Sequence, residues 1–219
     1  MDVVKKAHEH LSKFSKGGGL TTGKVRSASA KLFRELDDKS IDNVFNLCKK
    51  MLDERQWALK IIAFDWAYRV RNQYNDNTFT VFENWLKEYI TDWGDCDDFC
   101  THAFGYLIAT RNDLFRKVKE WVNDSNFAVR RAAPVVLIYP INHDTYDKLD
   151  PLTVSDALMT DEHYLVLKGY GWMLKVLAQK EPEKVIDYLI INKDIMPRVA
   201  YRYALEKLDK ETKDRLMSK

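Results

Sequence analysis

Apolar residues recur at every third or fourth position along most of this chain, a spacing that places them on one face of a helix. In the stretch DVVKKAHEHLSKF, one such stripe contains Val4, Ala7, Leu11 and Phe14. No alternation of the kind that marks strands persists, so the pattern predicts an all-α protein. After the N-terminal helix, we expect helices near residues 26–36, 41–52, 54–73, 78–90, 95–109, 112–122, 126–139, 152–158, 162–179, 182–191 and 196–207.

The segments between these helices are short and polar, apart from the glycine-rich stretch SKGGGLTTG at residues 15–23. Short links between helices of similar length favour antiparallel neighbours. We therefore predict a single repeat domain over residues 1–219. Residues 1–20 would hold the first helix and the glycine-rich loop, and residues 26–207 would form stacked helical pairs.

A weak internal repeat supports stacked pairs. The stretches DERQWALKIIAF, DSNFAVRRAAPVVL and DEHYLVLKGYGWML share an acidic start, an apolar patch and a basic residue, which is Lys60, Arg130 or Lys168; Arg202 is a fourth candidate. With one anchor assumed near residue 95, the step is about 35 residues, as in helical-pair repeats. Residues 124–137 also approach the HEAT pattern D-x4-V-R-x2-A-x3-L. This predicts a HEAT-like or armadillo-type solenoid whose second helices line a concave groove.

Arg130 and Arg131 stand side by side in an otherwise apolar helix. Adjacent residues lie about 100° apart around a helix, so the two cations cannot point the same way. One of them can connect neighbouring repeats while the other faces the groove. The simpler alternative is that both are solvated or paired with nearby carboxylates.

The stretch YITDWGDCDDFC crowds aspartates around a helix start. Acidic residues are favourable there because the helix N-terminus carries partial positive charge, so Asp92 or Asp95 is a candidate cap and the others are candidate surface residues. Trp93 and Asp97 are four residues apart and share a face if the helix already includes Trp93. A tryptophan beside a carboxylate is then a plausible ligand site.

Composition narrows the functional classes. No apolar run is long enough to span a membrane, and no secretory signal is recognisable. Three cysteines, an odd number, favour reduced thiols in a cytoplasmic compartment. Cys96, Cys100 and His102 do not complete a four-ligand shell, so we expect neither a metal nor a cofactor. The apolar stripes predict four tryptophans in the core: Trp57, Trp66, Trp85 and Trp121.

Three segments resemble the AlkD-type alkylpurine DNA glycosylases, a family built from HEAT-like repeats. DWGDCDDF is similar to that family's W-D-x-x-D segment, NFAVRRAA to its F-W-x-R-R-x-A segment, and VLKGYGWMLK to its K-x-x-G-W-x-L-R segment. They occur in the family's order, and the resemblance spans residues 45–205. It implies that Asp97 is the catalytic aspartate, Arg131 the arginine beside it, and Trp93 and Trp172 the two site tryptophans. The sequence departs from the pattern at Asp92, Gly94, Ala128 and Lys175.

The resemblance implies an enzyme that excises cationic N3- or N7-alkylated purines from double-stranded DNA by hydrolysing the N-glycosidic bond, without base flipping. We expect a cytoplasmic monomer that contacts phosphates through basic side chains, with Arg130, Lys60, Lys168, Lys175 and Arg202 as candidates. Two other readings stay open. The first alternative is a non-catalytic HEAT-like module that binds damaged or branched DNA. The second is a protein-binding scaffold.

Overall fold

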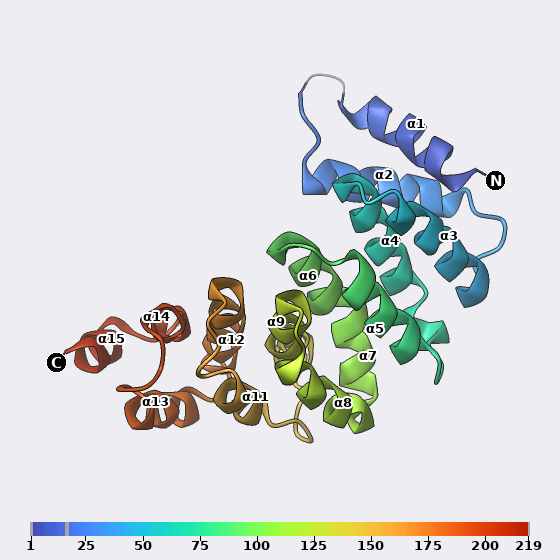
Figure 1. Ribbon diagram of the computed structural model, residues 1–219. Coiled ribbons are helices and arrows are strands. Elements are labelled where there is room, and N and C mark those ends of the chain that lie inside the picture. Colours follow the sequence, from blue (N-terminus) through green and yellow to red (C-terminus); the bar gives the residue numbers. More distant parts are fainter. Residues whose placement is uncertain (1, 16–17, 219) are drawn as a thin grey trace. The chain divides into compact units, whose positions relative to one another are not determined.

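A computed structural model describes residues 2–15 and 18–218, and these residues contain helices, turns and loops but no strand (Figure 1). The all-α prediction is confirmed. Part of the predicted glycine-rich loop, residues 16–17, lies outside the described residues. The contacts divide the chain into two compact units, residues 1–107 and 108–219, and each is considered by itself. The expected single continuous domain stays a prediction.

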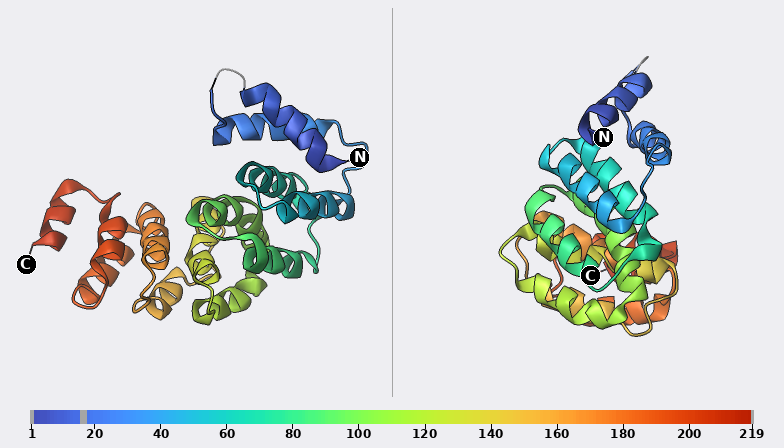
Figure 2. Two further views of the ribbon diagram at one scale, coloured as in Figure 1. Left: turned by 45° about the horizontal axis from the view of Figure 1, so that its top comes forward. Right: turned by 90° about the vertical axis from the view of Figure 1, so that its right-hand side faces the viewer.

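The first unit consists of helices packed in pairs, with α1 against α2 and α3 against α4 (Figures 1 and 2). α4 also contacts α2 and α6, so it lies at the centre of this unit. The helices of the first unit are α1 (Val3–Ser15), α2 (Thr22–Arg34), α3 (Ile41–Asp53), α4 (Trp57–Arg69), α5 (Thr78–Tyr89) and α6 (Trp93–Phe99); a π-helical segment, Cys100–Phe104, and α7 (Gly105–Thr110) follow.

In the second unit, α12 packs against α9, α10, α11 and α14. Its helices are α8 (Phe115–Glu120), α9 (Phe127–Val135), α10 (Ile138–Asn142), α11 (Pro151–Ala157), α12 (Tyr164–Leu177), α13 (Pro182–Ile191), α14 (Arg198–Leu205) and α15 (Lys210–Met217). The sequence did not predict α15, which Asp209 caps by accepting a hydrogen bond from the backbone amide of Thr212.

The predicted repeat of about 35 residues is confirmed by where the second helices begin. Successive starts are 34 to 37 residues apart, and they fall at Thr22, Trp57, Trp93, Phe127, Tyr164 and Arg198. Four of these six first residues are aromatic. The repeat therefore places an aromatic side chain at equivalent ends of several helices.

Several predicted helix boundaries are wrong for local reasons. The helix expected at 54–73 begins only at Trp57, because Arg55 has a left-handed backbone with φ of 54°. The helix expected at 126–139 stops at Val135, where a tight turn follows in which the amide of Leu137 donates to the carbonyl oxygen of Pro134, and α10 begins at Ile138. The helix expected at 95–109 begins at Trp93, because Asp92 caps it, and a π-helical turn interrupts it.

Aromatic rings fill much of the first unit's interior. Phe64 stacks on Phe99 with 4.6 Å between the ring centroids, and Phe82 contacts Phe99 and Phe104 edge-on. Trp66 and Trp85 are buried here and Trp121 is buried in the second unit, as the sequence predicts. Trp57 was wrongly assigned to the core, because its side chain at the start of α4 is 46% exposed.

We expect Gly171→Ala to destabilise the protein. A β-carbon at this position on α12 would lie 2.8 Å from the carbonyl oxygen of Ala200 and 2.8 Å from Cβ of Tyr203, so α12 and α14 would have to separate. Such overpacking costs about 1–3 kcal/mol, measurable as the free energy of unfolding in urea. The matched control is Gly23→Ala in α2, where a β-carbon meets nothing within 4 Å. Equal stability of the two variants would contradict the close approach of α12 to α14.

Candidate functional site

The first unit contains a cleft of about 470 Å³ at the N-terminal ends of three of its helices. Its lining includes the first residue of each helix: Thr22 of α2, Trp57 of α4 and Trp93 of α6. Because α4 packs against both α2 and α6, these three ends are fixed relative to one another. The cleft is therefore formed by rigid helices of successive repeats.

Helix α6 presents Trp93 and Asp97 to this cleft. Asp92 caps the helix, since its Oδ1 accepts a hydrogen bond of 2.9 Å from the amide of Asp95. Because the helix includes Trp93, Trp93 and Asp97 lie one turn apart on the same face. The indole of Trp93 is 58% exposed, whereas Asp97 is half-buried. An exposed aromatic ring and a carboxylate thus line one cleft.

Asp95 points into the protein, where it forms an ion pair with Lys60 of α4. The distance from Nζ of Lys60 to Oδ2 of Asp95 is 2.6 Å, and both side chains are buried. Burial raises the pKa of Asp95, and the hydrogen bond from Lys60 opposes that rise. Lys60 was predicted to contact DNA phosphates. In this structure the ammonium is buried and paired with Asp95, and its contact with DNA stays a prediction.

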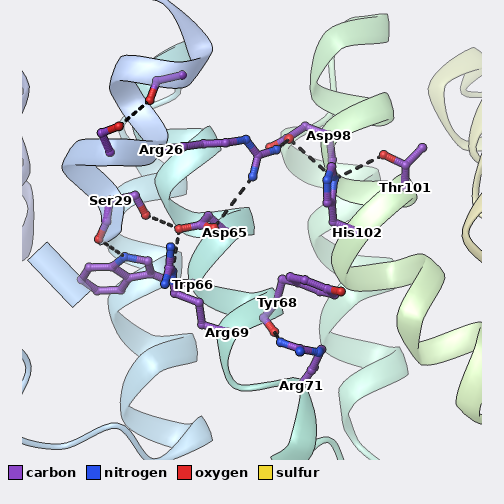
Figure 3. A network of polar contacts seen from close by, with 12 residues as sticks. Arg26, Ser29, Asp65, Trp66, Tyr68, Arg69, Arg71, Asp98, Thr101 and His102 are labelled. Atoms are coloured by element: carbon purple, nitrogen blue, oxygen red, sulfur yellow. Dashed lines mark hydrogen bonds and ion pairs between the residues drawn. The ribbon is translucent and has the colours of Figure 1, made fainter. Parts of the chain in front are cut away.

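Asp98 joins a second polar network, shown in Figure 3. Arg26 of α2 forms an ion pair with Asp98 and also approaches Asp65 of α4, with 3.8 Å between Nη1 and Oδ1. Ser29 and Arg69 both donate hydrogen bonds to Oδ2 of Asp65. Burial raises the pKa of Asp98, while the charge of Arg26 lowers it. This network ties α2, α4 and α6 together behind the cleft, and the sequence analysis did not anticipate it.

The π-helical segment after α6 places His102 in the wall of the cleft. Nδ1 of His102 lies 2.9 Å from the carbonyl oxygen of Asp98, and its side chain is 41% exposed. A π-helical turn inserts one residue into the helical register and often occurs at functional sites. His102 was considered only as a metal ligand in the sequence. Among the described residues, no group of three or more His, Cys, Asp or Glu side chains could hold a metal ion.

In the second unit, Arg130 and Arg131 point in different directions, as their spacing requires. Arg130 forms an ion pair with Asp161, 2.5 Å from Nε to Oδ2, and its Nη1 donates to the carbonyl oxygens of Asp124 and Ser125. It therefore connects α9 to the segment preceding α12. These bonds engage the guanidinium within the structure, and a contact between Arg130 and DNA stays a prediction.

Arg131 packs against α12. Its side chain lies against Gly169, where an added β-carbon would come within 3.2 Å of its Cγ, and its Nη1 donates a hydrogen bond to the carbonyl oxygen of Leu165. Only 4% of Arg131 is exposed. Trp172, the second predicted site tryptophan, is half-buried on α12. The convergence of Asp97 and Trp93 with these two residues of the second unit stays a prediction.

A basic and aromatic hollow of about 520 Å³ lies between α12 and α14 in the second unit. Its lining includes Tyr164, Arg198, Arg202 and Tyr203. Nζ of Lys168 lies 4.4 Å from the ring centroid of Tyr164 and 5.5 Å from that of Tyr203.

Cations remain accessible around this hollow. Arg202 is exposed, and hydrogen bonds to Tyr164 and Tyr203 raise the pKa of Lys168. Lys175 forms an ion pair with Glu206, 2.9 Å from Nζ to Oε2. Of the five predicted phosphate contacts, Lys168 and Arg202 are therefore the two that the structure leaves best placed to meet an anion.

No helix within the described part of the chain combines the length and apolar character needed to cross a bilayer.

Comparisons with known proteins assign the family. Residues 5–208 match the model of the family described as DNA alkylation repair enzyme. No curated protein gave a significant match. Among solved structures, one described as a "predicted DNA alkylation repair enzyme" from Enterococcus faecalis superimposes with a TM-score of 0.73 at 15% identity, covering 95% of this chain and 96% of that one. At this identity, the structural similarity supports the fold alone.

We expect Lys60→Met to destabilise the protein by about 3–5 kcal/mol, because it leaves the Asp95 carboxylate buried without its counter-charge. Urea denaturation measures the loss. In the double variant Lys60→Met/Asp95→Leu the uncompensated charge is gone, so most of the stability should return. The control is Lys49→Met, which removes an exposed pair with Asp53 and should cost at most about 1 kcal/mol. A Lys60→Met variant as stable as the Lys49→Met variant would show that the buried pair does not hold α6.

Proposed function

This chain belongs to the DNA alkylation repair enzyme family, and from that premise we propose that it is a DNA glycosylase. Its substrates would be cationic N3- or N7-alkylated purines in double-stranded DNA, and its reaction the hydrolysis of the N-glycosidic bond. The enzyme would act as a cytoplasmic monomer without a metal or cofactor and leave an abasic site. The observation that carries the proposal is the placement of Asp97 and the exposed Trp93 on one helical face at the cleft.

Hydrolysis of such a substrate needs a carboxylate near the sugar, and the cleft is lined by carboxylates. An alkylated purine with a positive charge is already a good leaving group, so no acid is needed to protonate it. As the glycosidic bond breaks, its electron pair leaves with the base and positive charge develops on the sugar. A fixed carboxylate near C1′ stabilises that charge and can orient the water that attacks it. Asp97 is our candidate for this group.

The neighbouring carboxylates are less suited to this role. Asp95 is held by Lys60 and Asp98 by Arg26, and both pairs serve to fix the helices. Asp97 shares its helix face with Trp93, whose exposed ring can contact the deoxyribose and shield the developing cation. We extend the proposal to Trp172 as the second ring and to Arg131 as the cation that favours ionised Asp97.

Double-stranded DNA would be bound mainly through its phosphates, independently of sequence. The hollow between α12 and α14 supplies cations for this purpose, and the interaction with the tyrosine rings positions Lys168. We propose Lys168 and Arg202 as phosphate contacts, with Lys175 contributing where its ion pair with Glu206 opens. The three helices that begin at the cleft would present the catalytic face to the duplex.

Asp97→Asn should lower the rate of base release about 100- to 1,000-fold, because the amide keeps the size of the side chain but removes its charge. This magnitude corresponds to about 3–4 kcal/mol of activation barrier and is taken by analogy with the removal of one oxyanion-hole donor. Release of 7-methylguanine and 3-methyladenine from a methylated duplex measures the effect. Asp187→Asn, at an exposed position on α13, is the matched control and should release base normally.

If the Asp97→Asn variant releases base at the normal rate, Asp97 is not the catalytic group. If the unmodified protein binds DNA tightly but releases no base at all, the non-catalytic DNA-binding module is the correct description.

Lys168→Ala and Arg202→Ala should each weaken binding to DNA of any sequence. Each lost phosphate contact lowers the slope of log Kd against log salt concentration by about 1, because one fewer counterion is released. Fluorescence anisotropy with a labelled duplex at several salt concentrations gives this slope. Lys184→Ala, which removes an exposed cation of α13, should leave it unchanged. If Lys168→Ala or Arg202→Ala leaves the slope unchanged, the substituted residue does not contact DNA.

A further inference from the structure

We propose that His102 is a further catalytic residue of the cleft in the first unit, where it accepts a proton from the water that attacks the sugar. The inference rests on the proposed glycosylase reaction and adds a group to it. The segment that resembles the family in this part of the chain ends at Phe99, so the resemblance assigns His102 no role.

Hydrolysis of a cationic nucleotide leaves one proton to be removed. The electron pair of the glycosidic bond leaves with the alkylated base, which becomes neutral and needs no proton. The oxygen of the water forms the new bond to C1′, so one of the two water protons has to leave. Enzymes most often pass such a proton to a positioned histidine, because imidazole exchanges protons near neutral pH. An ordinary carboxylate is the weaker base and is better suited to stabilising positive charge.

The π-helical segment Cys100–Phe104 brings His102 to the face that carries Asp97. Five residues at about 100° each would place these two side chains on different sides of an uninterrupted α-helix. A π-helix has more residues per turn, so each residue rotates the chain by a smaller angle. His102, Asp97 and Trp93 accordingly all line the cleft. The irregular turn thus adds an imidazole to the wall that holds the carboxylate.

One nitrogen of the His102 ring is held by the backbone (Figure 3). Nδ1 lies 2.9 Å from the carbonyl oxygen of Asp98 and 3.3 Å from Oγ1 of Thr101. A carbonyl oxygen only accepts hydrogen bonds, and the hydroxyl of Thr101 already donates to the carbonyl oxygen of Asp97. Both neighbours therefore require Nδ1 to carry the proton. In the neutral ring, Nε2 then has the lone pair that can accept a proton.

The other nitrogen, Nε2, is available to the cleft. Among the described residues, none forms a hydrogen bond with Nε2, and the side chain is 41% exposed. Tyr68 contacts the ring edge-on, with 6.0 Å between the centroids, and this contact limits the rotation of the ring. A water molecule in the cleft can therefore reach an acceptor whose orientation is already fixed.

A carboxylate beside the ring favours the charge that proton transfer creates. Oδ1 of Asp98 lies 3.8 Å from Nδ1 of His102, so its negative charge stabilises an imidazolium, although Arg26 shares this carboxylate and offsets part of the attraction. In the proposed step, the water oxygen bonds to C1′, the electron pair leaves with the base, and the water proton passes to Nε2. Asp97 stabilises the positive sugar meanwhile. The exposed imidazolium then returns the proton to solvent.

His102→Asn is the main test, because its side-chain amide can keep the bond to the carbonyl oxygen of Asp98 but has no counterpart of Nε2. Single-turnover release of 7-methylguanine from a methylated duplex should slow about 100-fold or more, the usual effect of losing a proton acceptor. Fluorescence anisotropy with the same duplex should show unchanged affinity, because the proposed role lies in the reaction and not in DNA binding. Normal release by this variant would overturn the inference.

Added imidazole provides a readout that a purely structural role would not change. His102→Ala leaves space in the wall of the cleft, so imidazole in solution should restore part of the base-release rate. Imidazole should not accelerate Asp97→Asn, which retains His102. A His102→Ala variant that stays slow at every imidazole concentration would overturn proton acceptance. If this variant fails to fold, the release rate of His102→Asn decides the matter.

His143→Ala is the matched control. Nδ1 of His143 lies 2.8 Å from the carbonyl oxygen of Tyr139, four residues earlier, which repeats the anchoring of His102. His143 belongs to the second unit and is not among the residues that line the cleft. Its substitution should leave base release normal, with or without imidazole.

The unmodified protein separates this inference from the proposed function. If the unmodified protein and both His102 variants release base at the same rate, His102 has no catalytic role and the glycosylase stands. If the unmodified protein releases no base, the glycosylase is refuted, and the role of His102 with it.

Discussion

The ion pair between Lys60 and Asp95 is the constraint on which the geometry of the first unit depends. Two charges are withdrawn from water, and each is tolerable only because the other lies 2.6 Å away. Asp95 belongs to the first turn of α6, so the pair fixes the start of that helix on α4. Once the start is fixed, helical geometry determines where Trp93 and Asp97 point, and both meet the cleft.

Ion pairs between cations and carboxylates one repeat further along the chain recur in both units. Lys60 and Asp95 are 35 residues apart, Arg130 and Asp161 are 31 apart, and so are Lys175 and Glu206. The second helices α4, α9 and α12 thus each use a basic side chain to hold the next repeat. The basic residues that the sequence predicts as phosphate contacts at this repeat position therefore also hold the repeats together.

The cleft combines this interior electrostatic framework with an aromatic rim. Lys60 and Arg26 neutralise two of the four aspartates from inside, and the helix starts place Trp57 and Trp93 outside. The result is an aromatic and acidic surface, which the proposed reaction would use to stabilise positive charge that develops on the sugar.

The sequence by itself left open whether Trp93 and Asp97 share a helix face, but it determined the helical class and the repeat of about 35 residues. These follow from periodicity and capping, which act over a few residues. It did not determine that Trp57 faces outward, that Lys60 is buried or that Arg26 reaches Asp98. Those outcomes depend on which helix packs against which. The sequence of an apolar stripe does not show whether the end of the helix packs in the core or lines a cleft. Only tertiary packing, through the partners 35 and 72 residues away along the chain, decided them.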